Sequence, residues 1–357
     1  MTRGKKPDPQ KKKKAFDLLA LIAIFARTNG IGLNDPTLVE RFLADAEPRL
    51  REALGDPALI HGSRVERLFE ATVLSLGRFK LLKSEDLGGV HGAQTYRAPD
   101  FRIVLNNGEQ WLVEVKNVRS DDPAVQELQM SPAYLASLQD YADIVGTPLK
   151  LAIFWSTWKF WSVISPEQFR ADDGSLKVSM AEAMVANDFG RLGEVTIMTK
   201  PPLRVVVHAA MDMPRSLTDE GVASFTGRSR TIYSGDVELT DPKDRKLAQI
   251  LMLHGEWRVE GPFPLLDGDQ ICGVEYVANP VESPDQGWDG IGMASRIFSR
   301  HYADQTIDGA EVIQLNGDPA PDWFAPLASW DFKTSKLPLL LGIVQARDPS
   351  RLPEQSE

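Results

Sequence analysis

The segment from Ala98 to Lys116, "APDFRIVLNNGEQWLVEVK", constrains the fold more than any other part of this 357-residue chain. Apolar and polar residues alternate on both sides of Asn106-Asn107-Gly108, a strong turn signal. The segment therefore predicts a β-hairpin with "DFRIVL" and "EQWLVEVK" as its strands. A charge that is buried in such a hairpin costs several kcal/mol unless a partner or a metal ion compensates it, so its acids and its lysine need an explanation.

Three of these charged side chains fall on one face of the predicted hairpin. In "WLVEVK" the side chains alternate, so Glu114 and Lys116 share a face and lie roughly 6.5 Å apart along the strand. With residues 106–108 as the loop, the register sets Asp100 opposite Glu114, with their Cβ atoms about 5 Å apart. Two carboxylates this close repel each other unless a cation lies between them. The face is therefore either solvated or a site, and a divalent ion held beside a lysine suits phosphodiester hydrolysis.

The segments around the hairpin predict the order helix, hairpin, helix, strand, strand. "SRVERLFEATVLSLG" predicts a helix with Ser63 as its N-cap and a buried stripe on one side. Residues 131–146 predict a second helix, with a serine start and a glycine stop. Residues 148–155 predict a buried strand, onto which residues 159–165 pair back. Beyond residue 166 the pattern predicts helices near 177–187, 243–254 and 290–303, and strands at 204–210 and 270–277.

The motif itself resembles that of a known family. Pro99-Asp100, thirteen intervening residues and then Glu114-Val115-Lys116 resemble the PD-(D/E)XK nuclease superfamily, in particular archaeal Holliday-junction resolvases and restriction-endonuclease-like enzymes. The resemblance covers residues 62–165. It implies a mixed sheet flanked by helices and cleavage of nucleic acid that depends on Mg²⁺ or Mn²⁺. Carried over, Asp100 and Glu114 hold the metal and the Val115 carbonyl can add a ligand. Lys116 then positions the water or stabilises the charged transition state.

The resemblance also implies a glutamate from the helix before the hairpin, and two residues compete for that role. With Val65 at the centre of the buried stripe, Glu66 lies about 100° round the helix and Glu70 about 140°. Glu66 is therefore the better placed of the two. Its alternative role is structural, because Ser63-x-x-Glu66 is also a capping-box pattern.

Members of the family often carry a glutamine, lysine or tyrosine on the helix that follows the metal-binding strand. Gln139 is the predicted site residue here and Tyr141 the other option, although "LASLQDYADI" is also an ordinary amphipathic helix. Gln129 is a weaker candidate. His91 precedes the motif and could touch substrate, but a loop histidine without a role is the simpler interpretation.

Two other patterns in the sequence offer alternatives to the motif. Acid-x-lysine triplets recur at 241–243, 244–246 and 331–333, but the first two sit at a helix start and Pro326 interrupts any strand before the third. "FWSTWKFW", residues 154–161, interleaves aromatic rings with a lysine, which could indicate base stacking. We expect most of these rings to belong to the core, because they lie in predicted strands.

Charge is distributed unevenly along the chain. The net charge is −10, yet residues 1–14 carry seven cations and one acid, which leaves −16 for the remainder. We expect a basic disordered tail at 1–14 that can hold nucleic acid, or that merely aids solubility. A single cysteine, Cys272, excludes an internal disulfide and suits a reducing cytosol. The longest apolar stretch, residues 18–25, is too short to span a bilayer, so no membrane partner is expected.

These patterns together predict an α/β protein. We expect an N-terminal helical segment at 15–60, a nuclease core with a restriction-endonuclease-like mixed sheet at 61–165, and a C-terminal α+β domain of unknown role at 166–357. The expected function is that of a cytoplasmic, Mg²⁺- or Mn²⁺-dependent DNA endonuclease of restriction, repair or phage-defence type, with a homodimer as one expected assembly. The alternative is a catalytically inactive nucleic-acid-binding or regulatory protein with the same fold.

Overall fold

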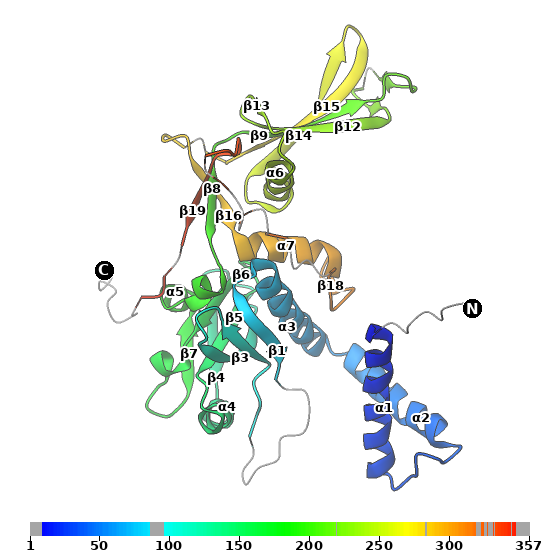
Figure 1. The fold of residues 1–357 in the computed structure, drawn as a ribbon, viewed down its shortest axis with the longest axis vertical. Helices are drawn as coiled ribbons and strands as arrows, with labels where there is room; N and C mark the ends of the chain where they lie inside the picture. The colour runs from blue at the N-terminus through cyan, green and yellow to red at the C-terminus, as the bar shows by residue number, and fades with distance from the viewer. Residues whose placement is uncertain are drawn as a thin grey trace, which may run out of the picture. The chain divides into compact units, whose positions relative to one another are not determined.

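The computed structural model describes residues 9–85, 96–218, 220–282 and 284–318 and parts of 323–347, with the backbone alone for residues 9–17 (Figure 1). The chain divides into two compact units, Met1–His61 and Gly62–Glu357. The candidate site lies within the second unit. The further boundary predicted at residue 165 stays a prediction.

The first unit is helical. It holds α1 (Pro9–Thr28) and α2 (Leu38–Leu54), which meet through the rings of Phe25 and Phe42 at a centroid distance of 5.5 Å. Because α1 begins at Pro9, the lysine run 11–14 lies in a helix and not in the disordered tail that the sequence predicts for residues 1–14. Lysine is a good helix former and an apolar run follows it, so the helix extends backwards through the lysines.

Helix α3 (Pro57–Leu76) starts earlier than the sequence predicts. Asp56 Oδ1 accepts hydrogen bonds from the backbone N–H groups of Ala58 (2.9 Å) and Leu59 (3.2 Å), as an N-cap does. Proline is favoured in the first turn, so Asp56-Pro57 is the true start signal. Ser63 therefore lies inside the helix, and the prediction of a cap at Ser63 is wrong. The buried stripe is confirmed, and it includes Val65, Leu68, Phe69 and Thr72.

The sheet that carries the candidate site has five strands in the order β1-β2-β3-β5-β6. Their bounds are β1 Phe79–Ser84, β2 Phe101–Leu105, β3 Gln110–Val118, β5 Leu149–Trp155 and β6 Phe160–Ile164. Strands β3 and β5 are parallel and the other neighbours are antiparallel, so the sheet is mixed, as predicted. The pairs Phe101–Val113 and Ile103–Trp111 confirm the predicted hairpin register.

Helices cover both faces of this sheet (Figure 1). On one face Trp111, Val113 and Val115 belong to the same buried cluster as the α3 stripe. On the other face Leu112 belongs to a second cluster with α4 (Pro132–Val145). This helix has the predicted serine start at Ser131 and glycine stop at 146. The alternation of β3 therefore holds, and the fold class is α/β with helices on both sides of a mixed sheet.

The aromatic segment at residues 154–161 belongs mainly to the core, as expected. Its members Phe154, Trp155, Phe160 and Trp161 are buried, whereas Trp158 in the β5–β6 turn is 41% exposed. The interpretation of this whole segment as a base-stacking surface is therefore wrong, because burial on both sheet faces removes four of its five rings from solvent.

The remainder of the second unit contains further sheets. Strand β4 (Glu127–Met130) pairs with β7 (Leu176–Ser179), and β16 (Asp289–Met293), β8 (Thr196–Thr199) and β19 (Leu339–Gly342) form a three-stranded sheet. An antiparallel five-stranded sheet has the order β13 (Val237–Glu238), β12 (Gly227–Ser234), β9 (Leu203–Ala209), β15 (Gln270–Asn279), β14 (Arg258–Asp267). Short pairs are β10 (Ser216–Leu217) with β11 (Ala223–Ser224) and β17 (Ile307–Asp308) with β18 (Glu311–Val312).

The helices of this region partly match the prediction. They are α5 (Met180–Val185), α6 (Pro242–His254), α7 (Ala294–Thr306) and the 3₁₀ turns Pro166–Phe169 and Asp188–Leu192. Helix α6 is confirmed. The helices expected at 177–187 and 290–303 begin later, because β7 and β16 take up the residues before them.

Candidate active site

Asp100 lies one residue before β2, where the hairpin ladder ends. The last paired residues are Phe101 and Val113, so the backbone of Asp100 no longer pairs with β3. Its side chain takes over this contact, because Oδ2 accepts a hydrogen bond from the Val115 N–H at 2.7 Å. Its carbonyl oxygen accepts from the Glu85 N–H at 2.8 Å. The carboxylate of Asp100 is thus held against the middle of β3, and its backbone is held by the residue that follows β1.

The protonation of Asp100 reflects its burial and, after that, crowding by other carboxylates. Burial raises its pKa from the ordinary 3.8 to about 8, and the charges of Glu114 and Glu66 act in the same direction. The Val115 N–H and the charge of Lys116 lower the pKa, but not enough to compensate. A carboxyl group with this pKa holds a proton at neutral pH unless a cation takes the proton's place.

Glu114 is nearly inaccessible, with 4% of its surface exposed. One of its oxygens, Oε1, accepts a hydrogen bond from Lys116 Nζ at 2.6 Å and another from the Tyr134 hydroxyl. The interpretation as a solvated sheet face is therefore wrong, because the sheet and α4 enclose the side chain. Both donors bind Oε1, so the other carboxylate oxygen of Glu114 can take a further ligand.

Lys116 joins Glu114 to helix α4. Its Nζ donates to the Tyr134 hydroxyl at 2.8 Å and lies 4.7 Å from the centre of that ring. Burial alone would lower the pKa of Lys116, but the neighbouring Glu114 charge and these hydrogen bonds raise it above its ordinary value. Lys116 therefore remains an ammonium ion at neutral pH.

Two residues of this site were not predicted from the sequence. Tyr134 makes both of the hydrogen bonds described above, and burial raises the pKa of its hydroxyl, as does the Glu114 charge. The Arg97 guanidinium lies 4.5 Å from the centre of the Tyr134 ring. The available signal was the helical spacing of Tyr134 with the buried Leu138, which places both on the side of α4 that faces the sheet.

The two glutamates of α3, Glu66 and Glu70, lie in different environments. Glu66 is half-buried, and its charge is one of those that raise the pKa of Asp100. Glu70 instead pairs with Arg67 on its own helix at 3.4 Å. The capping-box role of Glu66 is wrong, because Ser63 is not an N-cap. Of the two candidates, Glu66 is the one whose charge acts on the motif.

The remaining candidates lie elsewhere. The amide of Gln139 donates to Asp143 on its own helix at 2.8 Å. The hydroxyl of Tyr141 donates to Glu85 at 3.0 Å, in a separate group where Arg102 lowers the pKa of Glu85 to about 2. Gln129 donates to its strand neighbour Glu127 at 2.6 Å, and His91 lies outside the described residues.

The donor set suits a hard divalent cation. No cluster of three or more His, Cys, Asp or Glu side chains with metal-binding potential occurs in the described ranges. Asp100 and Glu114 are nevertheless two oxygen donors whose mutual repulsion a cation would relieve. Mg²⁺ is commonly bound by one or two carboxylates, with water and substrate phosphate as its other ligands. The residues therefore fit Mg²⁺ or Mn²⁺ better than a metal that needs a complete protein cage.

Comparisons with known proteins do not assign a family or a function to the chain. No protein-family model matches the chain, and no curated protein matches it either. Among solved structures, the chain is similar to Hjc, a Holliday junction resolvase from the archaeal hyperthermophile Archaeoglobus fulgidus, with 18% sequence identity and a TM-score of 0.27. The match covers 34% of this chain and 89% of the resolvase. A TM-score this low assigns no function. In addition, none of the described helices is long and apolar enough to cross a membrane.

Proposed function

We propose that the protein is a nuclease that depends on Mg²⁺ or Mn²⁺ and hydrolyses phosphodiester bonds in nucleic acid, with DNA as its substrate. The observation that carries the proposal is the grouping of Asp100, Glu114 and Lys116 beside the middle of β3, where burial and the nearby Glu114 charge raise the pKa of Asp100. Two crowded carboxylates lower the stability of the fold, because they repel each other. A divalent cation bound between them would relieve this repulsion and could also bind a substrate phosphate.

Each side chain has a distinct role in this proposal. Asp100 and Glu114 hold the metal, and the Val115 carbonyl can add a ligand. The bound ion supplies a Lewis acid beside the phosphate. Lys116 is no general base, because its raised pKa keeps it protonated. Its ammonium group instead stabilises negative charge on the phosphate oxygens or orients the attacking water. Tyr134 holds the Lys116 ammonium group in place.

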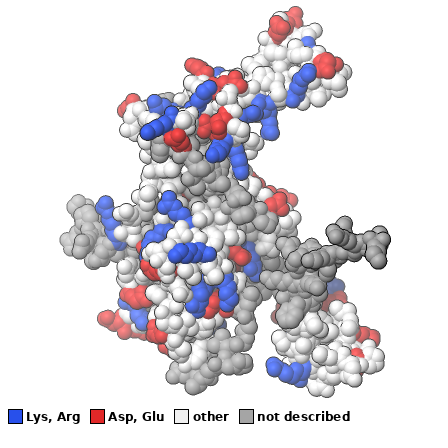
Figure 2. All heavy atoms as spheres, viewed as in Figure 1, with Lys and Arg blue, Asp and Glu red and all other residues white. Residues whose placement is uncertain are grey.

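Basic side chains near the β5–β6 turn support a nucleic-acid substrate. Burial lowers the pKa of Lys159, and so do the charges of Arg300, Arg296 and Arg64, so these four cations lie close together. Arg296 pairs with Glu256 and Arg64 donates to Thr306, whereas Lys159 makes no ion pair with any described residue. In the view of Figure 2, lysine and arginine side chains lie among acidic ones over the middle of the picture. We propose that Lys159 contacts the phosphate backbone, which would make binding salt-dependent.

Nicking of supercoiled plasmid tests the proposal. The wild-type protein should nick DNA with Mg²⁺ or Mn²⁺ but not with EDTA. Asp100→Asn, Glu114→Gln and Lys116→Met should each lower the rate at least about 100-fold. The ion pair between Lys177 and Glu127 on strands β7 and β4 offers matched controls of the same residue types. Glu127→Gln and Lys177→Met should nick like the wild type.

A second readout separates the nuclease from the inactive alternative. Metal should raise the melting temperature of the wild type and of Lys116→Met, and should raise that of Asp100→Asn and Glu114→Gln less, because only the last two lose a ligand. DNA binding without nicking by a folded, metal-binding wild type would support the catalytically inactive alternative. Metal-dependent nicking that persists in Asp100→Asn would refute the assignment of the site.

A further inference from the structure

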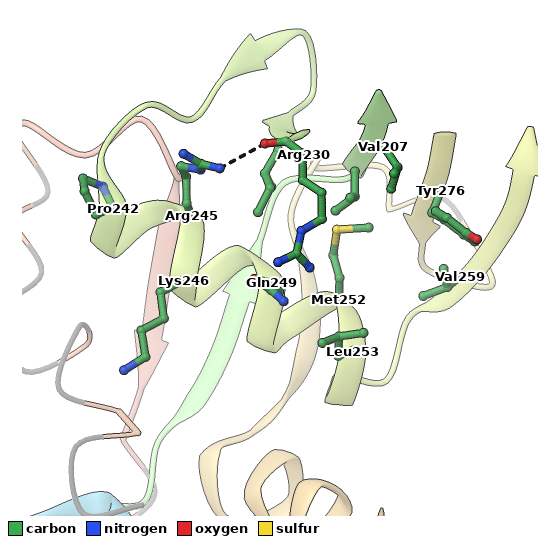
Figure 3. A pocket seen from close by; sticks show the side chains of 12 residues that line it. Val207, Arg230, Pro242, Arg245, Lys246, Gln249, Met252, Leu253, Val259 and Tyr276 are labelled. Carbon is green, nitrogen blue, oxygen red and sulfur yellow. Dashed lines mark hydrogen bonds between the residues drawn. The ribbon is translucent and has the colours of Figure 1, made fainter. Parts of the chain in front are cut away.

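A cleft of about 720 Å³ lies between helix α6 and one face of the antiparallel five-stranded sheet (Figure 3). All of its lining residues come from the segment 205–276, so it is separate in sequence from the motif residues at 99–116. Its volume falls in the range of small-molecule sites, roughly 300–1,000 Å³.

The sheet side of the cleft is an apolar wall with one cation. Val205 on β9 pairs with Ile232 on β12 and with Tyr276 on β15, and Val207 pairs with Arg230. Residues two apart on a strand share a face, and so do directly paired residues. The register therefore places these five side chains on one surface, with Arg230 at its edge.

The helix side of the cleft is one stripe of α6. Residues at helical spacing line it, and the opposite stripe of the helix is buried in the core. The lining stripe consists of Pro242, Arg245, Lys246, Gln249, Met252 and Leu253. In Figure 3 the Arg230 guanidinium points across the cleft toward the Gln249 amide, whereas Lys246 extends away from the sheet.

The charge around the cleft has one sign. Arg230, Arg245 and Lys246 line it and no acidic residue does, although the chain as a whole carries a net charge of −10. None of the three makes an ion pair within the part of the chain that the structure describes. Arg245 donates only to the Arg230 carbonyl, at 3.0 Å. Unpaired guanidinium groups beside an apolar wall favour a ligand that combines an anion with an apolar body.

We propose that this cleft binds a nucleoside phosphate. The guanidinium groups of Arg230 and Arg245 suit a phosphate, which accepts paired hydrogen bonds from such groups. The Met252 thioether and the Tyr276 ring suit the faces of a planar base. Gln249 carries both a donor and an acceptor, which matches the mixed edge of a base. The proposal is independent of cleavage chemistry, since it concerns binding at other residues.

Titration calorimetry of the full chain tests the proposal, with AMP, GMP, CMP and UMP as probes and EDTA present to suppress phosphate binding through metal. At least one nucleotide should bind at one site per chain. The comparison ligands are inorganic phosphate, octanoate and the nucleoside of the nucleotide that binds most tightly, for example adenosine for AMP. Each should bind at least about tenfold more weakly than that nucleotide, because each lacks the base or the phosphate.

Variants assign the binding to the cleft. Arg230→Ala should lower the affinity for the most tightly bound nucleotide by about tenfold or more, and Arg230→Lys should lower it by less. Lys246→Ala is the matched control, because Lys246 points away from the sheet, and it should bind within about twofold of the wild type. Arg245→Ala, at an exposed helix position, gives a second loss of binding if Arg230→Ala is unstable. The proposal is overturned if none of the four nucleotides binds, if octanoate binds more tightly than each of them, or if both arginine variants bind like the wild type.

Discussion

Asp100→Asn should change how the stability of the metal-free protein depends on pH. The folded state raises the pKa of Asp100 from 3.8 to about 8. Between these values the unfolded chain ionises this carboxyl group while the folded protein retains its proton. The contribution of Asp100 to stability is therefore largest below pH 4, falls as pH rises through this window and levels off above pH 8. Asparagine removes the titration but keeps an oxygen that can accept the Val115 N–H.

The expected magnitude follows from the width of the window. One pKa unit corresponds to about 1.4 kcal/mol, so the rise from pH 5 to pH 8 should cost the wild type about 4 kcal/mol that Asp100→Asn does not lose. For a unit of this size, that difference corresponds to a shift in melting temperature of roughly 6 °C. The free energy of unfolding of the variant, relative to the wild type, should thus increase between pH 5 and pH 8.

The assay is thermal melting in EDTA at half-unit pH steps from 5 to 8. Glu85→Gln is the control, because Arg102 lowers the pKa of Glu85 from 4.5 to about 2, so its effect on stability changes below pH 5. Its difference in melting temperature from the wild type should stay constant from pH 5 to pH 8. Parallel pH profiles for the wild type and Asp100→Asn would refute the crowded carboxylate pair, and with it the physical basis of the metal site.

Three further predictions concern neighbouring residues. Tyr134→Phe should slow nicking by roughly tenfold without weakening the metal-induced melting shift, because the hydroxyl holds Lys116 and is no metal ligand; an unchanged rate would exclude that role. Glu66→Gln should flatten the pH profile attributed to Asp100 and Glu70→Gln should not, which thermal melts in EDTA would show; equal profiles would mean that neither glutamate acts on the motif. Lys159→Ala should lower the slope of log affinity for duplex DNA against log salt by about one, as measured by fluorescence anisotropy.

The hairpin could be predicted from the sequence in full, because all of its determinants are local. The turn at 106–108 and the period-two alternation fix which residues are paired, and the pairs of β2 with β3 confirm that register. The same reasoning failed where pairing is non-local. Strands β7 and β16 pair with β4 and β8, which lie far away in the sequence, and each takes residues that a helical pattern had claimed. Short strands of this kind carry too few residues for a local signal.

The helices were harder to predict from the sequence for a different reason. The start of α3 was predictable from Asp56-Pro57, but the serine and glutamate at 63 and 66 gave a competing cap pattern inside the helix. Tyr134 was missed for a geometric reason: which turn of α4 lies over β3 depends on how the helix crosses the sheet. The sequence gives the spacing within the helix, and only tertiary packing decides that the first turn, rather than the turn with Gln139, meets Lys116.

A raised carboxyl pKa does not by itself mark a functional site. A comparison of Glu194 with Asp100 in this chain illustrates the difference. Burial raises the pKa of Glu194 to about 7, close to that of Asp100. Glu194 lies just before β8, and its Oε1 accepts from the N–H groups of Val195 and of Ser295 at the start of α7. The main causes of its shift are burial and these neighbouring hydrogen bonds. It acts as a buried structural contact between β8 and α7. Asp100 differs because two neighbouring carboxylates contribute to its pKa, and such repulsion is the feature that a divalent cation removes. Adding Mg²⁺ should therefore flatten the pH dependence due to Asp100 and leave that due to Glu194 unchanged.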